Sequence, residues 1–276
     1  MRRAILAIVA FCAMVTAAWA DDSPLRRLNT MDDSRGWEAV GRLELGGSGF
    51  CTGALIAPNL VLTAAHCLFD PATKKRVDFG SIEFLAGLRD GRAEAYRRVR
   101  RVVIHPSYRY DGQATAERVR NDLALLELLR PVQSTSITPF KTGLQLRKGE
   151  SVGVVSYAMD RAKAPSFQES CGVMHRQKGV VVLSCDVNFG SSGAPVFRIQ
   201  NGEAQIVSVV SAKADLDGTQ VALGAQLDGA VELLKTQLAS GIGVTEDFMP
   251  RIKGATPVTG RLQSQRSVGG AKFVKP

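Results

Sequence analysis

FGSSGAPV, residues 189–196, places Ser192 among small residues, with Gly190 before it and Gly193 directly after it. A serine nucleophile needs an open approach for a substrate carbonyl and backbone N–H groups that face the oxyanion formed on it. Glycine permits the sharp turns that expose such donors. Because glycine- and serine-rich turns are also common in ordinary loops, the interpretation of this stretch depends on residues elsewhere in the chain.

Two polar residues upstream suggest partners for this serine. His66 follows the apolar segment 54–62, among small residues that leave room around its ring, and Asp122 opens the apolar run 123–126. A histidine in apolar surroundings is often a satisfied core residue, and an aspartate before a strand is often a turn residue. In the alternative, the aspartate orients an imidazole that acts as a base, and the order His66, Asp122, Ser192 matches a known triad order.

Short apolar or alternating segments recur along the chain, separated by turn residues. Many short strands at fairly regular spacing, with few helical periods, predict barrels or sandwiches. One helix is expected at 227–238, where Val231, Leu234 and Leu238 share a face. The predicted strands cover 37–45, two strands within 54–62, 82–88, 99–104, 123–128, 152–157, 180–185, 195–199, 206–211 and 221–226.

The first residues are typical of a secretory signal peptide, residues 1–20. Arg2 and Arg3 precede the apolar stretch 4–15, and 18–20 form a small-x-small cleavage site. The alternative is a membrane anchor, but the apolar stretch is short for a spanning helix and two aspartates follow at once. We therefore expect an exported protein, secreted or periplasmic, without stable membrane insertion.

The net charge of +9 is concentrated at the two ends of the chain. Arg2 and Arg3 supply +2 and residues 251–276 supply +6 with no acid, so residues 21–250 carry +1. A near-neutral body is not typical of a nucleic-acid-binding domain, and no nucleic-acid partner is expected. The basic run 97–101 leads into apolar residues and is interpreted as the solvated face of a strand.

Four cysteines lie outside the expected signal peptide, an even number that suits disulfides in an oxidising compartment. Sequence alone permits three pairings. Cys51–Cys67 together with Cys171–Cys185 is favoured, because each of these pairs brackets one plausible hairpin.

Three segments carry a family resemblance: CTGALIAPNLVLTAAHC (51–67), NDLALLEL (121–128) and CDVNFGSSGAPVF (185–197). They resemble the trypsin-like serine endopeptidases of the chymotrypsin fold, and within them the secreted bacterial branch that includes the glutamyl endopeptidases. The resemblance covers roughly residues 36–240. It implies an all-β fold of two six-stranded antiparallel β-barrels with the active site between them, followed by a C-terminal helix. No metal or organic cofactor is implied.

Sequence pattern and composition, together with the resemblance, divide the chain into segments with separate roles. The expected segments are a signal peptide (1–20), an N-terminal leader or arm (21–35), a first barrel with the histidine and aspartate (36–130), a linker (131–149), a second barrel with the nucleophile (150–226), the helix (227–240) and a basic, disordered tail (241–276).

By resemblance, His66 is the general base and acid, Asp122 its orienting carboxylate and Ser192 the nucleophile. The backbone N–H groups of Gly190 and Ser192 match the oxyanion hole, and Cys51–Cys67 matches the family's disulfide beside the histidine. The implied activity is hydrolysis of peptide bonds in protein or peptide substrates, by a monomer. The alternative is a non-catalytic homologue that binds peptides or a partner protein. An esterase-like hydrolase is disfavoured because the motif lacks the G-x-S-x-G spacing.

Asp186 and Ser211 are predicted to contact the substrate. Asp186 lies six residues before Ser192, the register at which trypsins carry the acid that selects Arg or Lys. A buried carboxylate facing a substrate cation is a strong selector. In the alternative, Asp186 only bonds loop N–H groups. The strand 206–211 contains no histidine to meet a carboxylate, which argues against a glutamyl preference.

Ser191 stands where trypsins carry the aspartate that pairs with a newly cut N-terminal ammonium. An ammonium buried against a neutral hydroxyl would lack a counter-ion, so this switch is not expected here. Arg27–Leu28 and Arg35–Gly36 are basic sites in an aperiodic, exposed-looking segment. Cleavage at either site is expected to remove a leader or a steric block, and not to create a required charge.

Overall fold

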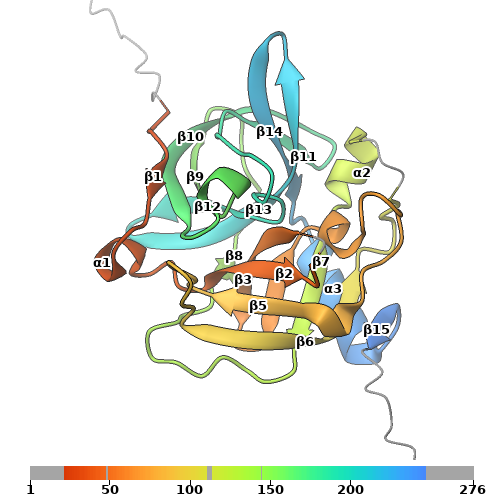
Figure 1. The fold of residues 1–276 in the computed structure, drawn as a ribbon. Helices are drawn as coiled ribbons and strands as arrows, with labels where there is room; N and C mark the ends of the chain where they lie inside the picture. The colour runs from red at the N-terminus through yellow and green to blue at the C-terminus, as the bar shows by residue number, and fades with distance from the viewer. Residues whose placement is uncertain (1–21, 48, 111–113, 144, 247–276) are drawn as a thin grey trace, which may run out of the picture.

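Two antiparallel β-barrels lie next to each other in the computed structural model (Figure 1). The structure describes residues 22–47, 49–110, 114–143 and 145–246. The expected signal peptide and most of the expected tail lie outside these ranges. Among the described residues, no helix has both the length and the apolar character to cross a membrane.

The first barrel closes through six strands in the order β6-β5-β2-β3-β4-β7, with β7 returning to β6. A turn at Pro58–Asn59 joins β3 to β4, as the sequence predicted. In β6 the buried Val99 lies between the exposed Arg98 and Arg100, so the basic run is a solvated strand face. The strands are β2 (Val40–Leu45), β3 (Phe50–Ala57), β4 (Leu60–Thr63), β5 (Ile82–Ala86), β6 (Ala95–Ile104) and β7 (Ala124–Leu128).

The second barrel closes through β10-β11-β14-β13-β12-β9, with β9 returning to β10. Two short strands, β1 (Arg26–Arg27) and β8 (Lys141–Thr142), extend this sheet by pairing with β10 and β13. The six barrel strands are β9 (Ser151–Ser156), β10 (Ser166–Gln177), β11 (Val180–Leu183), β12 (Pro195–Gln200), β13 (Glu203–Leu216) and β14 (Thr219–Gln226).

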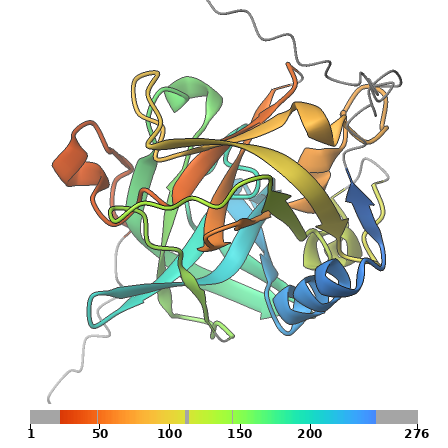
Figure 2. The same ribbon diagram turned by 90° about the horizontal axis from the view of Figure 1, so that it is seen from below.

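The helices are short and lie outside the barrels (Figure 2). The C-terminal helix α3 (Ala230–Ser240) buries Val231, Leu234 and Leu238 and ends at Gly241, whose φ is +74°. The fold class is therefore as predicted: two closed six-stranded barrels with a C-terminal helix. The remaining helical turns are α1 (Met31–Ser34), α2 (Ala116–Arg120) and the 3₁₀ turns η1 (Ala65–Leu68), η2 (Phe79–Ser81) and η3 (Met159–Arg161).

An aromatic cluster joins the two barrels. Trp37 lies 4.6 Å from Phe167 and 5.0 Å from Phe197 between ring centroids, and Phe140 lies 4.7 Å from Phe197. Phe167 and Phe197 are second-barrel residues, yet they belong to the same buried cluster as the core of the first barrel. Burial of this apolar surface stabilises the contact between the two barrels.

Four strands lie where the sequence indicated none: β10, which belongs to the second barrel, and the short strands β1, β8 and β15 (Val244–Glu246). β8 lies inside the expected linker, and β15 lies inside the expected tail and pairs with β6. Edge pairing of this kind satisfies backbone N–H and C=O groups and needs no apolar periodicity in the added strand. The remainder of the expected tail, residues 247–276, lies outside the described residues.

The segment before the first barrel is a structured arm. Leu28 is fully buried in the main core, and its N–H donates to the carbonyl of Pro165 at 2.9 Å. Thr30 and Asp33 form a capping box at the start of α1. The expectation that Arg27–Leu28 is an exposed site was therefore wrong: the polar composition of the arm hid the burial of one leucine. Arg35, by contrast, is exposed.

Candidate active site

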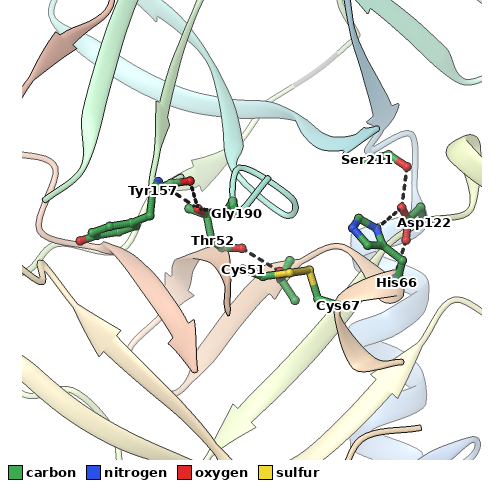
Figure 3. The surroundings of a disulfide bond; sticks show 9 residues. Cys51, Thr52, His66, Cys67, Asp122, Tyr157, Gly190 and Ser211 are labelled. Atoms are coloured by element: carbon green, nitrogen blue, oxygen red, sulfur yellow. Dashed lines mark hydrogen bonds and ion pairs between the residues drawn. A yellow bond between two sulfur atoms is a disulfide. The ribbon is translucent and has the colours of Figure 1, made fainter. Parts of the chain in front are cut away.

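His66 and Asp122 are held together by two hydrogen bonds (Figure 3). His66 lies in η1, directly after β4, and Asp122 lies between α2 and β7. The ring nitrogen Nδ1 of His66 lies 2.6 Å from Oδ2 of Asp122, and the backbone N–H of His66 donates to Oδ1 at 2.8 Å. The side chain of Asp122 is 1% exposed and that of His66 18% exposed. This arrangement fixes both the position and the rotation of the imidazole.

Ser211 supplies a third hydrogen bond to the same carboxylate. Its Oγ, on β13 of the second barrel, donates to Oδ2 of Asp122 at 2.5 Å. Ser211 is buried. The sequence interpretation placed Ser211 at the substrate, whereas its hydroxyl contacts the carboxylate that orients His66. The only local signal was a polar residue inside an otherwise apolar strand.

Ser192 lies beside β3 and is partly exposed, whereas its neighbour Ser191 is fully buried. The carbonyl of Ser192 accepts a hydrogen bond from the N–H of Thr52 at 2.8 Å. Gly193 follows with φ +78°, and a Cβ there would lie 2.3 Å from the carbonyl oxygen of Thr52, so only glycine fits. In the described part of the chain, no hydrogen bond joins Oγ of Ser192 to the imidazole of His66.

The backbone around Gly190 presents donors that are free for a ligand. Among the described residues, the N–H groups of Gly190 and Ser192 have no hydrogen-bond acceptor. The carbonyl of Phe189 accepts from Met159 at 2.8 Å, and because a trans peptide is planar, the N–H of Gly190 points the opposite way. Gly190 has φ +96°, and a Cβ there would lie 2.4 Å from the ring of Phe50. This position therefore also requires glycine.

A network of neutral groups supports this loop from behind. Oγ of Ser191 donates to Oγ of Ser156 at 3.2 Å, and the N–H of Asn188 donates to Oγ of Ser191 at 3.3 Å. Thr52 connects the loop to the first barrel: its hydroxyl donates to the carbonyl of Gly190 at 2.8 Å and accepts from the N–H of Tyr157 at 3.1 Å. Sequence reasoning did not identify Thr52, because its partners lie more than a hundred residues away.

Residues 47–205, more than half of the chain, match the family of trypsin-like peptidase domains. The chain belongs to this family.

Relatives of this trypsin-like peptidase domain include both a trypsin and a glutamyl endopeptidase. Trypsin from Simulium vittatum is 29% identical over 188 residues, which are 58% of this chain and 69% of that protein. Glutamyl endopeptidase from Bacillus licheniformis is 25% identical over 153 residues, 54% of this chain and 46% of that protein. Serine protease 56 from Mus musculus is 37% identical over 99 residues, and the match spans only 15% of its length.

A solved structure of a Glu endopeptidase in complex with MPD superimposes with a TM-score of 0.63. It shares 20% of its residues with this chain and covers 81% of this chain and 98% of its own. At this identity the likeness is one of fold. It confirms the chymotrypsin fold that the three sequence segments implied.

Asp186 does not occupy the buried position that its predicted role requires. Its side chain is exposed, and its backbone N–H donates to Oε1 of Gln168 at 2.7 Å. The side chain of Asp186 points outward because the buried side chains of Cys185 and Val187, on either side of it, face the core. A role for Asp186 in selecting Arg or Lys rests on sequence register alone.

Both disulfides join the pairs that the sequence favoured. Cys51 is bonded to Cys67, with 6.2 Å between their Cα atoms, and Cys171 to Cys185, with 5.1 Å. The potential ligand atoms of Cys51, Cys67 and His66 lie within 4.8 Å of one another. Sulfur atoms joined in a disulfide lack the thiolate that binds a metal, so these three residues do not fit a metal site.

Tyr108 and Arg118 lie close enough to Asp122 to feel its charge. The phenol oxygen of Tyr108 accepts from Nε of Arg118 at 3.2 Å, and the guanidinium lies 4.8 Å from the ring centre of Tyr110. Burial, together with the nearby charge of Asp122, raises the pKa of Tyr108. The phenol therefore remains protonated and neutral at neutral pH.

Proposed function

We propose that the protein is a secreted serine endopeptidase that hydrolyses peptide bonds through an acyl-enzyme. The observation that carries this proposal is the two-point hold of His66 by Asp122 inside a trypsin-like peptidase domain. With Nδ1–H bonded to the carboxylate, the other ring nitrogen, Nε2, is left as the base. In this proposal, the base takes its proton from the hydroxyl of the partly exposed Ser192.

In the proposed reaction, Oγ of Ser192 attacks the peptide carbonyl while Nε2 of His66 takes its proton. The imidazolium then gives that proton to the leaving amine, and the buried Asp122 stabilises the positive charge. A water molecule, activated in the same way, hydrolyses the acyl-enzyme and releases Ser192. The free N–H groups of Gly190 and Ser192 supply hydrogen bonds to the oxyanion of each tetrahedral intermediate.

Export from the cytoplasm is part of the proposal. The first twenty residues have the pattern of a signal peptide, and two disulfides suit an oxidising compartment. The substrate is a protein or peptide, and the protein acts as a monomer. The exposed Asp186 provides no buried charge that would select the residue at the scissile bond.

A second candidate is a non-catalytic homologue that binds peptides. The observation that favours it is the absence, within the described residues, of a hydrogen bond between Ser192 and the imidazole. Catalytic hydrogen bonds are often long in the absence of substrate, so this observation does not outweigh the held imidazole.

Covalent labelling separates the two candidates. The mature protein is incubated with a fluorophosphonate probe, and the labelled peptide is identified by mass spectrometry, with casein hydrolysis measured in parallel. We expect stoichiometric label on Ser192 and hydrolysis that the probe abolishes. An unlabelled, folded protein that binds casein without cutting it would establish the non-catalytic homologue instead.

A further inference from the structure

Residues 22–28, here called the N-terminal strap, are integrated into the second barrel (Figure 1). β1 pairs with the start of β10, and Leu28 is buried in the core. Ser23 and Ser170 exchange hydrogen bonds: the N–H of Ser23 donates to the carbonyl of Ser170 at 2.8 Å, and the N–H of Ser170 donates to Oγ of Ser23 at 2.8 Å. The strap is thus held at Ser23, at β1 and at Leu28.

Gln168 links this strap to the segment that leads into the nucleophile loop. Its side chain is 4% exposed and uses both ends of its amide: Nε2 donates to the carbonyl of Ser23 at 3.1 Å, and Oε1 accepts from the N–H of Asp186 at 2.7 Å. A buried amide that bridges two backbone groups fixes the distance between them. Gln168 therefore sets the position of Asp186 relative to the strap.

A second bridge joins the strap to Ser184, two residues before Asp186. Oγ of Ser184 donates to Oδ1 of Asp22 at 2.8 Å and accepts from the N–H of Gly172 at 2.8 Å. Both bridges therefore connect the strap to the same short segment, residues 184–186. This segment contains Cys185, so the disulfide to Cys171 closes the same assembly.

The nucleophile has separate supports that do not involve the strap. The carbonyl of Ser192 is bonded to Thr52, the N–H of Gly193 donates to Val210 at 2.8 Å, and the N–H of Ala194 donates to Ser191 at 3.0 Å. Loosening of the strap would therefore displace residues 184–186 while the nucleophile stays in place.

We infer that Gln168 is a positioning residue for substrate selection, and that the strap is a permanent part of the enzyme whose loss alters the fit of the acyl-side residue of the substrate. The inference rests on the proposed function, since residues 184–188 lead directly into Gly190 and Ser192. The strap acts through internal backbone groups and not through a terminal ammonium.

A double-mutant cycle in the full-length exported protein tests this inference. Gln168→Met keeps the volume of the side chain and removes both hydrogen bonds, and Ser23→Pro removes the N–H and the hydroxyl that tie the strap to Ser170. We expect each variant to raise KM for the best peptide substrate about tenfold and to leave kcat within about twofold, because the lost hydrogen bonds do not touch the nucleophile. The double variant should resemble either single variant, because the two changes act in series on the attachment of residues 184–186 to the strap.

Arg26→Gln is the matched control, because it removes an exposed ion pair to Asp33 in the same strap and leaves both bridges intact. It should not change KM. Variants with unchanged KM, or with reduced kcat and unchanged KM, would overturn the inference. Hydrogen exchange at the N–H of Asp186 is measured in the same proteins and should accelerate in Ser23→Pro. This readout needs no activity, so failed labelling of Ser192 in the parent would contradict the proposed function alone.

Discussion

At the scale of single residues, adjacent serines have opposite environments. Ser191 is fully buried with hydrogen bonds to neutral groups, whereas Ser192 is partly exposed. Ser192→Ala should abolish fluorophosphonate labelling without changing the thermal unfolding midpoint. Ser191→Ala should keep the labelling and lower the free energy of unfolding by about 1–2 kcal/mol through its lost hydrogen bonds.

The two variants are compared by gel-based labelling and by differential scanning calorimetry. A labelled Ser192→Ala together with an unlabelled Ser191→Ala would show that the motif has been interpreted one residue out of register.

His105 makes stability depend on pH. Burial lowers the pKa of its imidazole, and Nδ1 accepts a hydrogen bond from the N–H of Ser107 at 3.3 Å. The unfolded chain takes up this proton near pH 6.5 and the folded chain at a lower pH, so stability falls as the pH drops below about 6.5. His105→Asn keeps an acceptor for Ser107 and should flatten the dependence of the free energy of unfolding on pH between about 5 and 7.

Urea unfolding at a series of pH values measures this effect. His175→Asn, the same substitution at an exposed position, is measured alongside. An identical pH profile for parent and His105→Asn would assign the acid sensitivity to other groups.

At the scale of elements, one side chain connects two barrels. Thr52 on β3 is fully buried and satisfies both the carbonyl of Gly190 and the N–H of Tyr157. Thr52→Val preserves the shape but leaves both groups without a partner, which should lower the free energy of unfolding by about 2–4 kcal/mol and slow the labelling of Ser192. Thr52→Ser keeps the hydroxyl and should cost only about 1 kcal/mol for the lost methyl group.

Guanidinium unfolding and the rate of fluorophosphonate labelling follow the two variants. Equal losses in Thr52→Val and Thr52→Ser would mean that packing of the methyl group, and not the two hydrogen bonds, is the contribution of this residue.

Most of the barrel strands could be predicted because their signal is local. The exception is β10, whose twelve residues are mostly polar and have no apolar run. Alternation and short apolar runs identified β6 and β7, and the turn at Pro58–Asn59 separated β3 from β4. β8 and β15 escaped prediction because they are held by backbone pairing at sheet edges, which leaves little trace in side-chain pattern. Element boundaries within the barrels were also shifted: the strand expected from residue 37 begins at Val40.

The candidate site could be predicted only in part, because some of its contacts join residues that are distant in sequence. His66, Asp122 and Ser192 stand next to strand ends and carry recognisable residue types in a known order. The contacts of Ser211 with Asp122 and of Gln168 with Asp186 join residues 89 and 18 positions apart. A buried serine or glutamine within a strand has many potential partners, and only the register of the folded barrels selects one of them.

At the scale of the whole molecule, activation should be independent of a terminal charge. Ser191 is satisfied by Ser156 and Asn188, so no carboxylate stands at its position to receive an ammonium. Mature protein starting at Asp21 should have the same kcat/KM whether its N-terminus is free or acetylated, because burial of an unpaired ammonium is costly. The measurement is hydrolysis of one fluorogenic peptide by both forms.

A protein cleaved after Arg35 and freed of the preceding segment is the matching control for the strap. It should lose substrate affinity regardless of acetylation. Activity that requires a free amine at one defined residue would contradict this prediction and would require an acid beside Ser191.

The position of the strap in the chain has a consequence for folding kinetics. Ser23 and its partner Ser170 are separated by 147 residues, so the ribosome produces the strap long before β10 exists. Closing so long a loop carries an entropic cost, and contacts distant in sequence slow the folding of β proteins. Residues 22–28 are therefore synthesised well before their partners in β10 and are among the last to find their place, and substrate discrimination should mature after the barrels have closed.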